Sequence, residues 1–263
     1  LFRSFAIELK FGPYAPDIDK TTGIMGTPFS DLFGDSGTPV GGRPAWQLLT
    51  QVEFDYQFFS RLGTLGVGLS GGYYRISAPQ FNYFPTATGS AVCTAVDNGS
   101  GGRTYSAPPG IDASGCFSGD SNIFNLVPLE LLLIYRFDWL DRRFKIPIVP
   151  YVKGGLAYSF WWNGTSGSFV ANLQFEKSGS AYSPLANGPA VSGGTAGLAV
   201  HPGLALDLGV IDRQAQQIMD RELGVNRISL FCEMNYAWMT NFGVGSKLNL
   251  SNLTFSAGLL AEF

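Results

Sequence analysis

The chain has 263 residues, of which 45% are hydrophobic and 14% aromatic, but only 14% are charged, with a net charge of −3. This charged fraction is low for a soluble domain, the aromatic content excludes intrinsic disorder, and the charge balance gives no basis for binding nucleic acid. No run of about 18 apolar residues is present, so we expect no transmembrane helix.

Alternation with a period of two residues predicts eight β-strands. In the first strand, for example, the apolar Ile7 and Leu9 are separated by Glu8. Most of the eight exceed the 5 or 6 residues of an average strand and reach the roughly 9 to 11 that a tilted membrane-spanning strand needs. In chain order they cover residues 5–12, 46–58, 65–73, 129–137, 148–162, 198–208, 227–238 and 252–263.

The two faces of these strands differ in size as well as polarity. One face is almost uninterrupted Leu, Val and aromatic residues, whereas the other mixes Gly, Ala and Ser with charges. Eight strands enclose a narrow interior that large side chains would overfill, so we expect the apolar face to meet lipid. A soluble, lipocalin-like barrel is the alternative. Aromatic residues at the strand ends predict two membrane girdles, Tyr56, Phe58, Tyr135, Phe137 and Trp139 at one rim and Trp46, Tyr73, Tyr158, Trp162 and Trp238 at the other.

The connections between strands alternate in length. Long segments at about residues 14–44, 77–121 and 163–193 alternate with short ones near 60–64 and 138–145. Long loops on the outside are typical of outer-membrane barrels, and an even strand number places both termini on the periplasmic side. The sequence therefore predicts one domain, residues 1–263, forming an eight-stranded antiparallel up-and-down barrel in a bacterial outer membrane.

One connection on the short side breaks this pattern. The apolar residues Ile211, Ala215, Ile218 and Leu223 recur at helical spacing, and Gly224 is a natural helix stop. We predict a short periplasmic helix over residues 211–223. It either packs under the barrel or along the membrane interface, or it docks a periplasmic partner.

The charged residues on the small face form the main candidate site. Ions inside a small barrel must pair or be hydrated, because isolated burial of a charge is costly. We therefore predict cross-strand ion pairs, with Lys10 and Lys153 among the carboxylates, that close the lumen to solutes; a proton or small-ion path through them is the alternative. The predicted network consists of Glu8, Lys10, Glu53, Asp55, Glu130, Arg136, Lys153, Arg227 and Glu233.

The three cysteines fall into two settings. In an oxidising compartment, Cys93 and Cys116 would form a disulfide within one polar loop, and Cys232 would face lipid; three free thiols in a reducing compartment are the alternative. Asp17, Asp19, Asp31 and Asp35 could bind Ca²⁺ in the first loop, but they lack an ordered ligand spacing, so solvated turns are favoured.

Catalytic motifs are present only in the wrong structural context. Residues 66–71 fit a dinucleotide fingerprint and Gly68, Ser70 and Gly72 fit a nucleophile elbow, but both lie inside a predicted strand without a following helix. The single histidine, His201, is not placed to form a triad with Ser70. We therefore predict no catalytic residues, no metal and no cofactor, and a chain that is not an enzyme.

Three segments carry a resemblance to a known family. The stretch Phe5–Ile18 with its Gly12-Pro13-Tyr14 end, the segment Phe29–Asp35, and the helix followed by Gly224-Val225-Asn226 together are similar to myxobacterial outer-membrane β-barrel proteins. The resemblance implies an outer-membrane barrel and carries no catalytic residue to this chain.

The expected function is that of a membrane anchor or structural component whose extracellular loops contact a partner or a surface assembly; a small ion-conducting pore is the alternative. Outer-membrane lipid is one expected partner, and a protein bound by the loops or the periplasmic helix is another. Loop aromatics either make that contact or pack over the barrel mouth. The candidates are Phe81, Tyr83, Phe84, Trp161, Trp162, Phe169 and Phe175.

Overall fold

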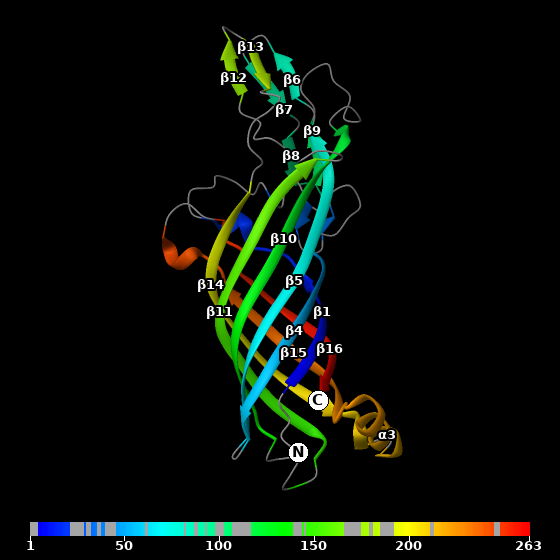
Figure 1. Cartoon of the computed structure of the whole chain (residues 1–263). Helices are drawn as coiled ribbons and strands as arrows, with labels where there is room; N and C mark the ends of the chain where they lie inside the picture. Colours follow the sequence, from blue (N-terminus) through cyan, green and yellow to red (C-terminus); the bar gives the residue numbers. More distant parts are fainter. Residues whose placement is uncertain are drawn as a thin grey trace.

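Eight antiparallel strands close into a barrel, as the sequence predicts (Figure 1). The computed structural model describes residues 5–21, 29, 33–35, 38–39, 46–60, 63–81, 83–86, 89–92, 94–97, 103–106, 117–138, 144, 146–165, 175–178, 181–184, 192–210, 213–244 and 248–263. Barrel strands consecutive in the chain are neighbours, and β1 closes the sheet against β16. The barrel strands are β1 (Phe5–Tyr14), β4 (Gln47–Phe59), β5 (Thr64–Phe81), β10 (Phe117–Arg136), β11 (Ile148–Thr165), β14 (Ser192–Asp207), β15 (Arg227–Trp238) and β16 (Asn252–Glu262).

The barrel is apolar outside and polar inside. In β1 exposed and buried residues alternate strictly, and the outward Leu69, Leu131 and Leu156 are 58%, 56% and 57% exposed. A soluble lipocalin-like barrel has the opposite arrangement, because its outer face meets water. The soluble alternative is therefore wrong. Among the described residues, no helix is long and apolar enough to cross a membrane.

Four adjacent strands are much longer than the other four. β5, β10, β11 and β14 have 18, 20, 18 and 16 residues, whereas the other four have 10 to 13. They continue past one end of the barrel as a single wall (Figure 1). The boundaries predicted for strands three and four are therefore wrong, because the ladder between β5 and β10 continues to the pair Ser77↔Ile123 and beyond. The alternation of outward apolar residues, from which the boundaries were predicted, already ends near the exposed Arg75.

Short hairpins lie beyond the upper end of this wall. Figure 1 shows β6 to β9, β12 and β13 there, all at the end opposite to the two termini. Segments predicted as loops thus contain paired strands. The hairpins at this end are β6 (Tyr83–Thr86) with β7 (Gly89–Val92), β8 (Thr94–Asp97) with β9 (Arg103–Ser106), and β12 (Phe175–Ser178) with β13 (Ala181–Pro184). In the described part of the first long connection, β2 (Gly34–Asp35) pairs with β3 (Thr38–Pro39).

An apolar cluster fills the upper part of the lumen. Tyr74, Leu126 and Leu250 are fully buried in it, and the rings of Tyr14 and Tyr74 meet edge to face at 5.0 Å. Phe29 and Phe33 from the first long connection also belong to this cluster, which is therefore closed partly by residues outside the barrel strands.

Helical segments are short. The α-helix α3 (Arg213–Leu223) confirms the predicted periplasmic helix; residues 211 and 212 lie outside the described part of the chain. Gly224 follows it with a φ of 69°, a left-handed conformation that favours glycine and ends the helix. Single 3-10 turns are η1 (Ile18–Lys20), η3 (Leu208–Val210) and η4 (Asn241–Gly243).

Candidate functional site: the lumenal ion network

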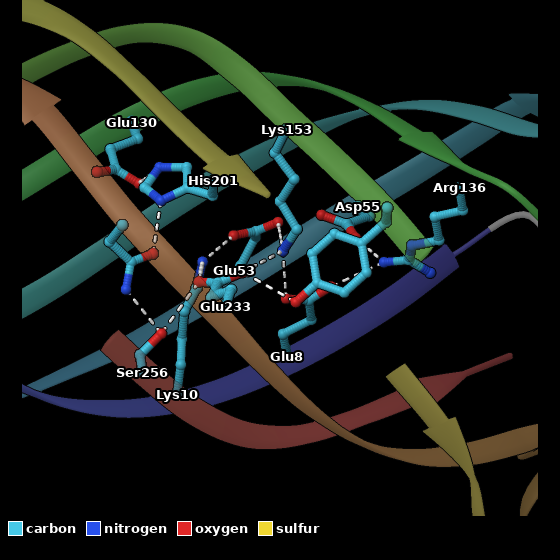
Figure 2. A network of polar contacts seen from close by, with 12 residues as sticks. Glu8, Lys10, Glu53, Asp55, Glu130, Arg136, Lys153, His201, Glu233 and Ser256 are labelled. Carbon is cyan, nitrogen blue, oxygen red and sulfur yellow. Dashed lines mark hydrogen bonds and ion pairs between the residues drawn. The ribbon is translucent and has the colours of Figure 1, made fainter. Parts of the chain in front are cut away.

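All nine charged residues predicted to face the lumen are buried there. They come from five of the eight strands, β1, β4, β10, β11 and β15, and the alternation of inward and outward residues along each strand places them inside. Figure 2 shows how most of them converge on the barrel axis. The most enclosed are Lys153 and Glu53, both at 0% exposure.

Lys153 is the centre of the network. Its Nζ lies 2.7 Å from Glu53 Oε1 and 3.6 Å from Glu233 Oε2, and it also contacts Glu8 Oε2 (Figure 2). A second amine, Lys10 Nζ, lies 2.5 Å from Glu53 Oε2 and 3.1 Å from Glu233 Oε1. Two amines and three carboxylates from β1, β4, β11 and β15 therefore join walls of the barrel that are not neighbours in the sheet.

Arg136 forms a second centre nearer the periplasmic end. Its Nη2 donates to Glu8 at 2.7 Å and to Asp55 at 2.6 Å, and its Nη1 donates to Glu262 at 2.9 Å. The Glu8 carboxylate forms ion pairs with both Arg136 and Lys153 and so connects the two centres. The planar guanidinium suits this position because it can serve several carboxylates at once.

Glycine at position 68 makes room for this part of the network. A Cβ at Gly68 would lie 2.6 Å from Asp55 Oδ1 and 2.8 Å from Ile134 Cδ1. Because heavy atoms do not approach so closely, a larger residue there would displace the carboxylate that Arg136 holds. The inward glycines of β5 are therefore a packing feature, and the dinucleotide and nucleophile motifs read from them have no structural counterpart.

A polarised hydrogen-bond chain leads from this network to the histidine. Ser256 Oγ donates to Glu233 at 3.2 Å, so it must accept the 2.8 Å bond from Asn235 Nδ2. Asn235 then presents its carbonyl oxygen to His201 Nδ1 at 2.6 Å, which assigns the proton to Nδ1. On the other side of the ring, His201 Nε2 lies 3.3 Å from Glu130 Oε2 (Figure 2).

The geometry does not fit a resident metal ion. Glu8, Glu53 and Asp55 each bring one carboxylate oxygen within 4.8 Å of the others. These carboxylates, however, already accept charged hydrogen bonds from Lys153 and Arg136. A cation placed among them would have to displace two ammonium or guanidinium groups that are themselves buried.

A small cavity separates the ion network from the apolar cluster above it. Its volume is about 40 Å³, and its wall includes Tyr14, Gln51, Glu130, His201 and Leu250. At roughly 10 to 15 Å³ per water molecule, it has room for about three waters and not for a larger solute. The polar side chains at its floor are suited to holding such waters.

Sequence reasoning left out several members of this site. Glu262, Asp207, Asn235 and Ser256 all lie on inward faces and make the contacts with Arg136, Arg227, His201 and Glu233. The strand alternation already assigned Glu262 and Asp207 to the lumen, so that signal was available. Arg227 Nε lies 2.7 Å from Asp207 Oδ2, and in the sheet Arg227 pairs with Glu262 of β16.

The candidate partner-binding aromatics separate into different environments. Trp161 turns inward and stacks on Phe124, with ring centroids 6.3 Å apart, whereas Trp162 lies near Tyr73 with centroids 6.5 Å apart. The inward position of Trp161 follows from the same alternation that places Lys153 inside. The remaining candidates are Phe81 in β5, Tyr83 and Phe84 in β6 and Phe175 in β12, whereas Phe169 is outside the described residues.

Two other predictions concern loops. Cys93 and Cys116 lie outside the described residues, so their disulfide stays a prediction, whereas Cys232 is exposed on the outer face as expected. In the first connection, Asp17 accepts from Lys20 at 2.9 Å, and Asp19 accepts from the backbone of Phe29 at 2.7 Å. These two carboxylates therefore serve the turn itself.

The apolar outer wall, the ion-filled lumen and the long strand extensions at the end opposite the termini define a membrane-spanning β-barrel of the bacterial outer-membrane type. No protein-family model and no curated protein sequence matches the chain. Among solved structures, the chain is similar to the N-terminal β-barrel domain of OprF from Pseudomonas aeruginosa, with 11% identity, a TM-score of 0.36, and coverage of 99% of this chain and 98% of that one.

It is also similar to the outer membrane protein OprG from Pseudomonas aeruginosa, with 13% identity, a TM-score of 0.39, and coverage of 99% and 95%. These similarities are too distant to carry a function. The barrel itself confirms the class of protein that the sequence resemblance implied. The comparisons give no support for the narrower myxobacterial family.

Proposed function

We propose that the chain is a non-enzymatic outer-membrane barrel that anchors an extracellular strand platform, through which it contacts a partner or a surface assembly. The observation that carries the proposal is the filled lumen beneath a long, one-sided extension of the wall. A barrel that served transport would need an open path, whereas an anchor needs a rigid, closed one.

Two layers support a closed lumen. The lower one is the ion network, in which Lys153 and Glu53 have no exposed surface. The upper one is the apolar cluster around Tyr74, Leu126 and Leu250, all equally enclosed. A hydrated ion passing along the axis would have to break buried ion pairs and then cross an apolar layer, and both steps are costly. This favours an anchor over an ion-conducting pore.

The extension supports a role outside the membrane. Strands of 16 to 20 residues exceed the roughly 9 to 11 needed to cross a bilayer, so β5, β10, β11 and β14 extend well beyond it. Ordered structure that closure of the barrel does not require is commonly functional. The hairpins β6–β7, β8–β9 and β12–β13 at its end are the surface we assign to partner contact.

Conductance in a planar bilayer separates the two candidate functions. The purified, folded protein should give no steady single-channel currents, and steady currents in the wild-type chain would refute the anchor and support the pore. A variant with both Lys153→Ala and Arg136→Ala removes two cations of the lower layer but keeps the apolar cluster above it, so it should also give no steady currents.

The extracellular contact needs a separate experiment. Replacing residues 175–184 by a Gly/Ser segment should leave the barrel folded but remove the adducts that an amine-reactive cross-linker forms on intact cells. A matched control replaces the periplasmic residues 213–223 in the same way. Adducts that survive the first change and disappear with the second would place the partner on the periplasmic side.

A further inference from the structure

Helix α3 exposes large apolar side chains at the periplasmic end of the barrel. Ile218 is 55% exposed and Leu223 is 69% exposed, and Val210 in the preceding turn is 52% exposed. A surface helix of a globular protein turns such residues toward a core. In α3 they are left on the outside, next to the exposed and charged Asp220, Arg221 and Glu222.

The contacts of the helix fix which side meets the barrel. Gln216 Nε2 donates to the backbone oxygen of Asn226 at 2.9 Å, just before β15 begins, and the N–H of Val225 donates to the oxygen of Met219 at 3.3 Å. Seen down the helix axis at 100° per residue, Leu223, Met219 and Ile218 follow one another round one flank from Gln216, with Glu222 between Met219 and Ile218. Asp220 and Arg221 lie on the opposite flank. The helix therefore turns its polar Gln216 to the protein and has one mainly apolar flank, interrupted by Glu222, and one polar flank.

Helix α3 lies at the lower end of the lipid-facing wall. Figure 1 shows the helix beside the lower end of the barrel, at the height of the C-terminus, and not across the barrel mouth. The helix lies in the connection between the end of β14 and the start of β15. The outward residue Leu206 of β14 is 40% exposed, and the outward residue Leu230 of β15 is 47% exposed. The exposed apolar surface of the wall thus continues through Val210 onto the helix.

We propose that α3 lies in the plane of the membrane at its periplasmic surface, with Ile218 and Leu223 inserted at the boundary between phospholipid headgroups and acyl chains. Amphipathic helices of this kind insert their apolar face about 5 to 10 Å into that boundary. The charged flank with Asp220 and Arg221 faces water. The partner of this surface is a phospholipid leaflet, and the inference rests on the proposed placement of the barrel in a membrane.

Spin-label accessibility tests this placement directly. Single cysteines are introduced by Ile218→Cys, Asp220→Cys and Leu131→Cys on a background in which Cys93, Cys116 and Cys232 are replaced by Ser. Each variant is labelled with a nitroxide and folded into vesicles of phosphatidylethanolamine and phosphatidylglycerol. Leu131, an exposed outward residue that pairs with Leu69 and Leu156 in the lower part of the wall, is the reference for lipid contact, and Asp220 is the control for water.

The measured quantity is the ratio of a label's accessibility to oxygen to its accessibility to a water-soluble nickel complex. This ratio should be severalfold higher for the labels at positions 218 and 131 than for the label at position 220. If positions 218 and 220 behave alike while 131 reports lipid, the helix proposal is wrong and the membrane placement stands. If 218 is shielded from both reagents, the face contacts protein, and the proposal is again overturned. If 131 itself reports water, the placement of the whole barrel fails.

Discussion

Lys153 and Glu53 meet at 2.7 Å across the barrel, although β11 and β4 are not neighbours in the sheet. Their contact joins opposite walls at a height where both side chains are completely buried. Removing one partner of a buried ion pair leaves an uncompensated charge, which is far more costly than removing both. The stability of the barrel should therefore depend on this pair in a characteristic way.

Lys153→Met should lower the free energy of unfolding by about 3 to 5 kcal/mol, because it leaves Glu8 and Glu53 without their shared ammonium group. Urea unfolding in lipid vesicles, followed by tryptophan fluorescence, measures the change. Lys20→Met removes an exposed pair and should cost less than about 1 kcal/mol. Adding Glu53→Gln to Lys153→Met should recover part of the loss; no difference between Lys153→Met and Lys20→Met would contradict the network.

Gly68→Ala should destabilise the barrel by about 1 to 3 kcal/mol, because the added methyl group would meet Asp55 Oδ1 and Ile134 Cδ1. The matched control is Gly154→Ala, where the nearest atoms are 3.7 and 3.9 Å away, and it should be close to neutral. The same unfolding assay applies. Equal effects at the two positions would show that the glycines act through strand propensity and not through room for the network.

His201 should carry its proton on Nδ1. Because it is the only histidine of the chain, selective ¹⁵N labelling gives the signals of a single ring. The nitrogen shifts should identify Nδ1 as protonated, since Asn235 presents an acceptor to it. Ser256→Ala should weaken this preference, because it frees the Asn235 amide from its acceptor. A ring with an unprotonated Nδ1 in the wild-type chain would contradict the direction of the hydrogen-bond chain.

Leu131→Arg should cost about 2 to 4 kcal/mol in a bilayer, because this outward position lies near the middle of the apolar band. The control is Arg75, which lies on the outward face beyond the aromatic rim at Tyr73. Arg75→Leu should change the free energy of unfolding by less than about 0.5 kcal/mol, because this position lies outside the apolar band. Folding assays in vesicles of phosphatidylcholine measure both. A tolerated arginine at position 131 would mean that the outer wall does not face acyl chains.

Thiol labelling tests the prediction made for the cysteines. In vesicles without reductant, a charged maleimide should label none of the three if Cys93 and Cys116 are bridged, because the exposed Cys232 faces lipid. Reduction should then add two labels and unfolding the third, as counted by mass spectrometry. Two labels before reduction would exclude the disulfide, and early labelling of Cys232 would place it in water.

The sequence predicted which residues face the lumen, but not which of them contact one another. The period of two residues was sufficient to assign Glu8, Lys153 and Glu233 to the interior, because alternation fixes the face of every residue in a strand. It could not say which of them meet, since a contact such as that between Arg136 and Glu262 depends on strand order, register and barrel closure together.

The sequence also predicted the upper ends of β5 and β10 incorrectly. Hydrophobic alternation reports contact with lipid, and it stops where the outward face enters water, whereas the backbone ladder has no reason to stop there. Ser77 and Ile123 still pair beyond that point. For Trp161, the stacking on Phe124 favours the alternative of packing over the barrel mouth, and its position on the same face of β11 as Lys153 already indicated an inward side chain.

The upper parts of β5 and β10 belong to the same strands that cross the membrane, and their ladder continues above the apolar band. A mechanical pull on the upper ends of these two strands therefore acts along that ladder, where many backbone hydrogen bonds share the tension. The extension is therefore mechanically continuous with the part of the wall that lies inside the membrane.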